Sequence, residues 1–326
     1  MFTLKRKIKA HIVMEIKYYI LRIIVVKGAD VSQWQKHEAV VPKHVIDSAM
    51  IIDEMALFEF LKENFKKWGI KKMPISFFVP DTSVLLRTFT HPEELKSSEL
   101  KGYVEMELGH SIHLPFANPL IDVYDPHPED NEAIIFAAPS EEVMKLIGIM
   151  QDLHLVPKVA DVRALSTIRY LTHTAKIEET KTYLIADWSI NELSIAIYSA
   201  GTVEFLRYQT IETDLGQWKP SEEQGVVTFS HTDDDQAYRM VVTDQVLEID
   251  RIMNFFKFSL HKGEKEVDEI IVLGDNPTLD QVGQFLATNL STPLTIITDA
   301  VVAKDFPQFM HSDATLLGLA LKGVKQ

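Results

Sequence analysis

Residues 11–28 of the chain read HIVMEIKYYILRIIVVKG and carry its clearest structural pattern. The stretch alternates between apolar and polar positions and then becomes almost continuously apolar in ILRIIVV, a pattern that predicts the two strands of a buried hairpin. The turn between the strands carries Lys17, Tyr18 and Tyr19. A turn that held a phosphate would present small residues there, because bare backbone N–H groups must approach the ligand. The sequence therefore predicts, near the start of the chain, a β-hairpin whose turn holds bulky side chains.

The composition limits the class of protein. A chain of 326 residues can form two or more cores, and 46% hydrophobic with 25% charged residues is typical of a globular protein. No cysteine is present, which excludes disulfides and thiolate chemistry and fits a reducing cytoplasm. The net charge of -14 argues against nucleic-acid binding, which needs a basic surface.

The N-terminal segment departs from this acidity. We interpret its basic residues as an exposed strand edge and tail, and the alternative is a patch attracted to an anionic membrane surface. These residues are Lys5, Arg6, Lys7, Lys9, Lys17, Arg22 and Lys27. No apolar run approaches the roughly 20 residues of a membrane span, and polar residues interrupt the segment after Lys9, so no signal peptide is expected. We expect a soluble, cytoplasmic protein whose membrane association is indirect.

Strand and helix patterns alternate in both halves of the chain, which predicts an α/β fold with a mixed sheet in each of two lobes. Asp53 and Gly69 are the predicted limits of one helix, and residues 91–94 (HPEE) are predicted to open another that runs to about Gly109. After a polar stretch at 176–181, three short strands within 183–208 predict a meander. The acid-rich span 212–238 is interpreted as a solvated loop or small subdomain.

The order of these elements, with a strand hairpin at the start of each half, resembles the actin-like ATPase superfamily. Within it, residues 74–165 resemble the type IV pilus biogenesis protein PilM. Three segments carry the resemblance, namely VPDTSVLLRTFTHPEELK (79–96), GYVEMELGHSIHLPFANPLIDVY (102–124) and IIFAAPSEEVMKLIGIMQDLHLVPKVADVRALSTIRYL (134–171). The resemblance implies a two-lobed actin-like, or ribonuclease H-like, ATPase fold with an α+β subdomain inserted in the first lobe.

The domain limits follow from this resemblance. The first lobe would span residues 1–178, with a core of 1–82 and 139–178 and an inserted partner-binding subdomain at 83–138. The second lobe would span 179–326, with a core of 179–211 and 261–326 and a small, reduced subdomain at 212–260.

The resemblance also implies three nucleotide-binding loops, and all three depart from the family pattern. In the first turn Glu15 keeps a carboxylate, but bulky residues including Tyr18 and Tyr19 replace small ones. The second hairpin keeps Asp187, but Trp188 and Ser189 stand where the family has an apolar residue and a glycine. In the third loop Gly274 is kept, but Asp275 replaces a second glycine and disfavours the approach of a polyphosphate. We expect that the chain binds ATP and Mg²⁺ weakly or not at all, and that it has no catalytic residues and no metal site.

Members of this family bind the short N-terminal tail of a single-pass membrane partner, PilN, in a cleft beside the inserted subdomain. The predicted contacts on the strand and helix of that subdomain are Val84, Leu86, Arg87, Phe89, Tyr103 and Met106. The alternative is that most of these residues belong to the core.

The function that these observations favour is a cytoplasmic adaptor of a type IV or competence-type pilus machine, which binds a PilN-like tail and other inner-membrane platform proteins. One alternative is an active ATPase of the same fold, in which Glu15 and Asp187 organise magnesium and water. Another is a filament protein of the cell-division type.

Overall fold

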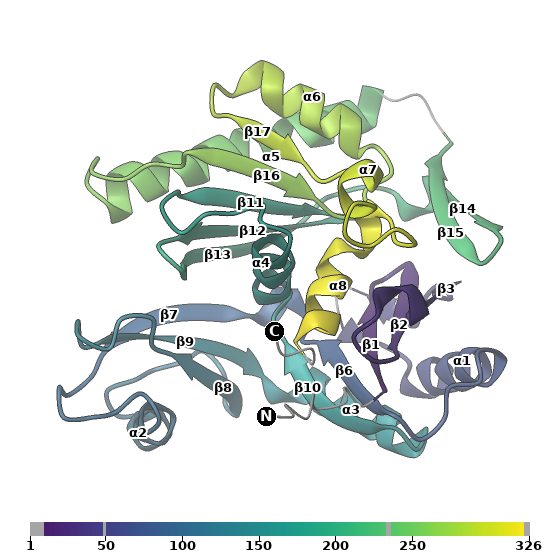
Figure 1. Cartoon of the computed structure of the whole chain (residues 1–326), viewed down its shortest axis with the longest axis horizontal. Helices are drawn as coiled ribbons and strands as arrows, with labels where there is room; N and C mark the ends of the chain where they lie inside the picture. Colours follow the sequence, from purple (N-terminus) through teal and green to yellow (C-terminus); the bar gives the residue numbers. More distant parts are fainter. Residues whose placement is uncertain (1–9, 48–49, 233–235, 323–326) are drawn as a thin grey trace, which may run out of the picture.

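The computed structural model describes residues 10–47, 50–232 and 236–322. Two α/β lobes lie one above the other, and the helices α4 (Arg163–His173) and α8 (Ala314–Leu321) lie between their sheets (Figure 1). A third, smaller sheet extends from the side of the first lobe below the second lobe. This arrangement leaves two regions where elements distant in sequence meet, one at the hairpin turns and one beside the small sheet.

The first lobe is built on a five-stranded sheet in the order β10-β6-β1-β2-β3. Its strands are β1 (His11–Ile16), β2 (Ile20–Val26), β3 (Gln35–Val40), β6 (Pro74–Phe78) and β10 (Val156–Asp161). The predicted first hairpin is confirmed, since β1 and β2 pair antiparallel with Glu15 opposite Arg22. Every residue of β2 is buried, because helices cover both faces of this central strand.

Helices α1 (Glu54–Lys67) and α3 (Ser140–Asp152) cover one face of this sheet, together with a short pair of strands, β4 (Ile46–Asp47) and β5 (Met50–Ile51). The predicted limits of α1 are confirmed. The side chain of Asp53 accepts a hydrogen bond from the backbone N–H of Ala56, and Gly69 ends the helix with a φ of 69°.

The inserted sheet has the antiparallel order β7-β9-β8 and is covered on one face by α2. Its elements are β7 (Leu85–Thr90), α2 (Leu100–Glu107), β8 (Pro119–Tyr124) and β9 (Glu132–Pro139). The prediction of a helix from residue 91 is wrong, since the chain forms turns until α2 begins at Leu100. Leu95 is the one large apolar side chain between Pro92 and Glu99 and packs against the core of the subdomain, which is too little to form the apolar face of a helix. The hydroxyl of Ser97 bonds to Asp125.

The second lobe has a five-stranded sheet in the order β13-β12-β11-β16-β17. Its strands are β11 (Tyr183–Trp188), β12 (Glu192–Ser199), β13 (Thr202–Thr210), β16 (Glu269–Leu273) and β17 (Leu294–Ile296). The predicted meander is confirmed, because β11, β12 and β13 pair antiparallel in sequence order. The helices of this lobe are α5 (Gln236–Asn254), which continues as a π-helix (Phe255–Leu260), α6 (Leu279–Asn289) and α7 (Asp299–Val302).

A separate hairpin, β14 (Trp218–Glu223) and β15 (Val226–His231), precedes α5 and reaches β3 of the first lobe. The span that the sequence predicted to be a solvated loop or small subdomain therefore contains an ordered hairpin. The backbone N–H of Val227 donates to Glu38 in β3 across 2.9 Å. Phe229 lies edge-on to Tyr19 with ring centroids 5.1 Å apart.

The lobes also share a hydrophobic core. One buried cluster joins Val13 and Ile24 of the first sheet to Tyr183 and Ile271 of the second, with the residues of α8 between them. The two lobes are therefore packed around common helices, which fixes the position of the loops where the lobes face each other.

Candidate functional site

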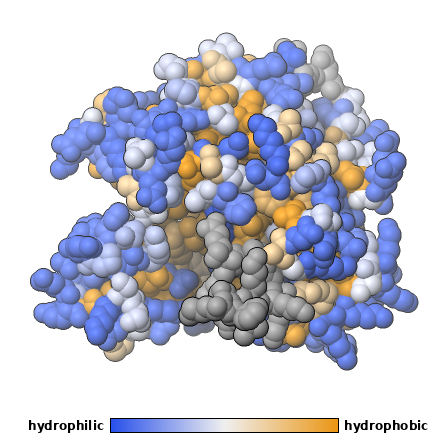
Figure 2. All heavy atoms as spheres, viewed as in Figure 1, coloured by the Kyte–Doolittle hydropathy of each residue, from blue (hydrophilic) through white to orange (hydrophobic). Residues whose placement is uncertain are grey.

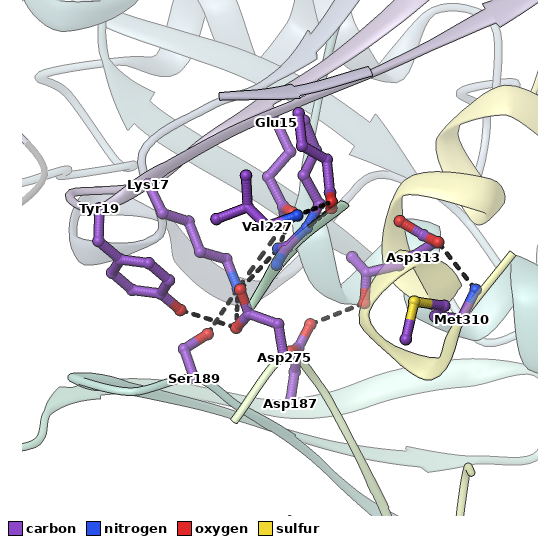
Figure 3. Close-up of polar contacts among 12 residues, drawn as sticks. Glu15, Lys17, Tyr19, Asp187, Ser189, Val227, Asp275, Met310 and Asp313 are labelled. Carbon is purple, nitrogen blue, oxygen red and sulfur yellow. Dashed lines mark hydrogen bonds and ion pairs between the residues drawn. The ribbon is translucent and has the colours of Figure 1, made fainter. Parts of the chain in front are cut away.

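The turn of the first hairpin directs its side chains across to the second lobe (Figure 3). A hydrogen bond of 2.8 Å from the N–H of Lys17 to the carbonyl of Ile20 closes the turn. Opposite it lie Ser189, in the turn between β11 and β12, and Asp275, in the loop that follows β16. The structure thus brings together the three loops that the sequence marked as degenerate nucleotide loops.

Lys17 and Tyr19 of the first lobe both bind Asp275 of the second. The ammonium of Lys17 lies 2.8 Å from Asp275 Oδ1 and 2.6 Å from the hydroxyl of Ser189. The hydroxyl of Tyr19 donates to the same Oδ1 atom across 2.8 Å. The side chains of Lys17 and Asp275 are only 3% and 1% exposed, so these contacts are shielded from water.

Arg22 of β2 adds a second cation to this contact. Its Nη1 atom donates to Asp275 Oδ2 across 2.6 Å and to Glu15 Oε2 across 3.1 Å. Its Nε atom donates to Glu38 across 2.9 Å. We call Glu15, Lys17, Tyr19, Arg22, Ser189 and Asp275 the cross-lobe ion cluster.

The interpretation of Lys17 and Arg22 as exposed, solvated residues is therefore wrong. Arg22 lies in a fully buried central strand, and carboxylates from elements distant in sequence surround both cations. Burial of a charge is tolerated only where such partners are present. Lys27 is exposed, whereas Lys5, Arg6, Lys7 and Lys9 lie outside the described residues.

Glu15 connects the cluster to α4. Its carboxylate accepts hydrogen bonds from Arg163 and Arg22, and Arg163 also donates to Asp81 across 2.7 Å. Burial raises the pKa of Glu15, but the charges of Lys17, Arg163 and Arg22 outweigh it and lower the pKa to about 2. The pKa of Lys17 is raised, because Asp275 and Glu15 outweigh its burial. Both side chains are charged at neutral pH.

Asp187 and Gly274 have structural contacts of their own. Asp187 accepts a hydrogen bond of 2.7 Å from the hydroxyl of Thr315 in α8. Gly274 has a φ of 121°, and a Cβ atom there would lie 2.2 Å from the carbonyl oxygen of Trp188. The glycine is therefore needed where the loop after β16 crosses the second hairpin. Tyr18 packs partly buried against the core of the second lobe.

The charged side chains of the cluster are paired with one another. The carboxylates of Glu15 and Asp275 each accept from two or more donors, and the hydroxyl of Tyr19 donates to one of them. In the part of the chain that the structure describes, no group of three or more His, Asp or Glu residues is placed to hold a metal ion. The arrangement binds one lobe to the other.

An open groove lies beside the inserted sheet. It has a volume of about 120 Å³ and runs between that sheet and the end of β10. We call it the edge groove, and its lining residues are Val79, Val84, Leu120, Ile121, Asp122, Phe136, Ala137, Ala138, Ala160 and Val162. Both β8 and β10 are edge strands of their sheets, so among the described residues the groove lies beside two strand edges that pair with no further strand. The edge groove is lined by residues of the first lobe and the inserted sheet alone. It is distinct from the wider hollow between the inserted subdomain and the second lobe that Figure 2 shows.

The six predicted partner contacts lie in different places. Val84 lines the edge groove, and Leu86 packs toward the second lobe beside Phe136. Phe89 is buried under α2, where Tyr103 stacks on its ring at 6.4 Å.

The remaining two contacts are exposed. Arg87 donates to the carbonyl of His113, and Met106 is 71% exposed on α2. The sequence predicted a strand at 119–124 but gave no reason to place it at the partner site, because PLIDVY has a single polar residue and does not alternate. The alternation appears only in the structure, where every second residue of β8 is exposed. Leu120, one of these residues, is 38% exposed and lines the edge groove.

Two α/β lobes that meet at paired hairpins and enclose two crossing helices define the actin-like ATPase fold. A solved structure described as "PilM-PilN type IV pilus biogenesis complex" matches with a TM-score of 0.76, at 18% identity, over 97% of this chain and 99% of that one. MreB5 of Spiroplasma citri bound to ADP matches with a TM-score of 0.52, at 9% identity, over 96% and 95% of the two chains. The predicted fold is confirmed.

The chain belongs to the family described as type IV pilus assembly protein PilM, whose family model matches residues 20–215. The family that the sequence pattern indicated is therefore confirmed. No significant match is found among curated proteins. None of the described helices has the length and hydrophobicity that a bilayer crossing requires.

Proposed function

We propose that this protein is a cytoplasmic adaptor of a type IV pilus assembly machine and that it binds the N-terminal tail of a PilN-like single-pass membrane protein in the edge groove. Membership of the PilM family supports the pathway, and the similar solved structure is described as a complex of PilM with PilN. The observation that carries the proposal is an open apolar groove beside two edge strands, β8 and β10, to whose outer edges no other described strand pairs.

The edge groove suits an extended peptide. An incoming strand can pair its backbone with the free edge of β8 or β10 and place alternate side chains against the apolar lining. Leu120 and Phe136 supply the larger apolar contacts, and Asp122 is the acidic residue in the lining. Main-chain pairing would provide affinity, and the apolar lining would select the tail's side chains.

A tail bound in this way would hold the adaptor at the inner face of the cell membrane. Membrane association would then be indirect, through the partner's single span and other proteins of the inner-membrane platform. The absence of a membrane-crossing helix among the described residues is compatible with this arrangement.

The first prediction concerns the side chain of Leu120. We expect Leu120→Asp to weaken binding of a synthetic N-terminal peptide of a PilN-like protein by at least about tenfold, because it places a charge in the apolar groove. Fluorescence anisotropy with a labelled peptide measures the dissociation constant. The matched control is Met106→Asp, which changes a more exposed apolar residue on α2, outside the groove.

The control also separates the two predicted surfaces. Affinity within about twofold of wild type for Met106→Asp, together with the loss for Leu120→Asp, supports the edge groove. The reverse result would place the tail on α2 and overturn the proposed site. Unchanged binding in Arg87→Glu would exclude Arg87 as a partner contact.

We further propose that the adaptor works without a bound nucleotide. Lys17, Tyr19 and Arg22 point into the region between the hairpin turns and are held there by Asp275. The ATPase alternative needs Glu15 and Asp187 to organise magnesium and water, but Glu15 is bound by two arginines and Asp187 by Thr315. These contacts favour a scaffold over an enzyme.

The second prediction is that titration calorimetry with Mg-ATP gives no saturable heat and that the wild-type chain releases no phosphate above background. The physical reason is that buried ion pairs would have to separate before a triphosphate could enter. Tight binding of Mg-ATP, or turnover that disappears in Asp187→Ala, would contradict the proposal.

A further inference from the structure

Three hydrogen-bond donors of the first lobe converge on a single carboxylate of the second. The ammonium of Lys17 and the hydroxyl of Tyr19 each lie 2.8 Å from Asp275 Oδ1, and Arg22 Nη1 lies 2.6 Å from Oδ2. All three donors come from one hairpin, within six positions of each other. Asp275 follows β16, more than 250 residues further along the chain.

This donor set has the chemistry of an oxyanion site. A lysine supplies a point charge, an arginine supplies directed N–H groups, and a tyrosine supplies a neutral O–H donor. Such a set binds the oxygens of a phosphate as well as those of a carboxylate, because both present hydrogen-bond acceptors with negative charge. The ligand in this structure is part of the protein (Figure 3).

Asp275 is the main counter-ion of Lys17. The other carboxylate near the ammonium, Glu15, lies 3.8 Å away and is also bound by Arg22 and Arg163. Glu38 takes the Nε donor of Arg22 and is shared with Lys36. Removal of Asp275 would therefore leave Lys17 with a neutral serine hydroxyl as its nearest acceptor, and Tyr19 without the acceptor of its hydroxyl proton.

A surface hollow adjoins this buried position. A hollow of about 250 Å³ is lined by both Arg22 and Asp275, together with residues of β15 and the loop before α8. The hollow is large enough for a hydrated phosphate ion to approach the carboxylate from outside.

We propose that Lys17, Tyr19 and Arg22 form an oxyanion-binding site that the chain fills with its own Asp275 carboxylate, so that an internal anion joins the lobes. The site is latent in the wild-type protein and takes a phosphate ion when the carboxylate is removed. The inference deepens the proposal that the adaptor works without nucleotide, and it is independent of partner binding.

The third prediction tests this site with inorganic phosphate as the probe. The full-length wild type, Asp275→Ala and Asp275→Asn are compared by thermal unfolding across a phosphate titration, with chloride at equal ionic strength as the reference. We expect phosphate to raise the Tm of Asp275→Ala saturably, on the order of 2–4 °C above the chloride reference, because the anion replaces the lost carboxylate. Wild type and Asp275→Asn should show no such rise, since a side chain of full size still fills the site.

A further variant shows which residues bind the ion. Adding Tyr19→Phe to Asp275→Ala removes one donor and should weaken the phosphate response at least severalfold. If Asp275→Ala does not fold in chloride, Asp275→Ser serves in its place, and recovery of the folded state in phosphate is measured by circular dichroism. The inference is overturned by an equal phosphate response in wild type, by no response in Asp275→Ala, or by failure of phosphate to restore either variant. None of these assays contains the partner, so their failure leaves the edge-groove proposal standing.

Discussion

Glu15 is the residue through which the first hairpin, α4 and the cross-lobe ion cluster are connected. Its carboxylate is buried, accepts from Arg22 and Arg163, and has a pKa of about 2 in the folded protein. An acid whose pKa is lower in the folded state stabilises that state above its unfolded pKa, and this stabilisation is lost as the pH falls toward the folded value. Glu15 therefore stabilises the fold at neutral pH and loses that contribution between about pH 4.5 and pH 2.

The fourth prediction follows from the direction of this pH dependence of stability. We expect Glu15→Gln to lower the free energy of unfolding by about 3 kcal/mol at pH 7, because the pKa shift of Glu15 is worth roughly this amount. The difference from wild type should shrink as the pH falls below about 4.5. Urea unfolding at pH 7, 5, 4 and 3, followed by circular dichroism, measures the difference at each pH.

The control for this experiment is Glu141→Gln. The side chain of Glu141 is 80% exposed and pairs with Lys145 on the surface of α3, so its loss should change stability by no more than about 0.5 kcal/mol. A difference between Glu15→Gln and wild type that stays constant from pH 7 to pH 3 would contradict the assigned ion pairs.

At the scale of single residues, part of the site was predictable from the sequence. The sequence itself shows the bulky turn at Lys17–Tyr19 and an acid, Asp275, in place of a glycine. Their pairing was not predictable, because an ion pair depends on where two side chains meet in space, and Lys17 and Asp275 are 258 positions apart. For the same reason Arg22 was assigned to an exposed edge, although it lies in the centre of a sheet.

At the scale of elements, the contact between α4 and α8 connects the two lobes. Gly318 of α8 packs so closely on α4 that a Cβ atom there would lie 1.8 Å from the carbonyl oxygen of Ser166. That same carbonyl is part of helix α4, so it cannot rotate away as a side chain could. The carbonyl of Gly318 accepts a hydrogen bond of 2.9 Å from Arg169, which fixes the two helices further.

The fifth prediction concerns this helix crossing. We expect Gly318→Ala to lower the free energy of unfolding by about 1–3 kcal/mol, because the added methyl group forces the helices apart. Gly148→Ala in α3 is the matched control, since a Cβ atom at that position meets no neighbour within 4 Å. Its expected effect is a gain of up to about 1 kcal/mol from helix propensity.

Differential scanning calorimetry of the two alanine variants and the wild type gives the comparison directly. Equal stability of the two variants would show that the contact of α8 with α4 adjusts without cost.

The types of the helices and strands were predicted well where the hydrophobic period was long, as in α1 and the β11–β13 meander. The prediction was wrong at residues 91–99, where good helix-start residues precede a segment whose one large apolar side chain is Leu95.

For the whole molecule, three of the contacts that join the lobes bear directly on function. The first is the shared core around α8, the second is the cross-lobe ion cluster, and the third is the β14–β15 hairpin bound to Glu38. The cluster and the hairpin contact lie where the predicted nucleotide loops meet, and the edge groove lies outside this contact region. Because the joined lobes need no ligand to bridge them, the molecule is suited to present a fixed binding surface to a partner.

The α/β class, the hairpin at the start of each half and the family were all predictable from the sequence, because they depend on local hydrophobic periods and on motifs that are contiguous in the chain. The burial of Lys17 and Arg22 as counter-ions of Asp275, and the position of Leu120 in a groove beside β10, could be learned from the three-dimensional fold but not from the sequence. Both facts depend on which distant segments pack against each other, and packing is set by the whole set of buried surfaces and charges, which no local pattern records.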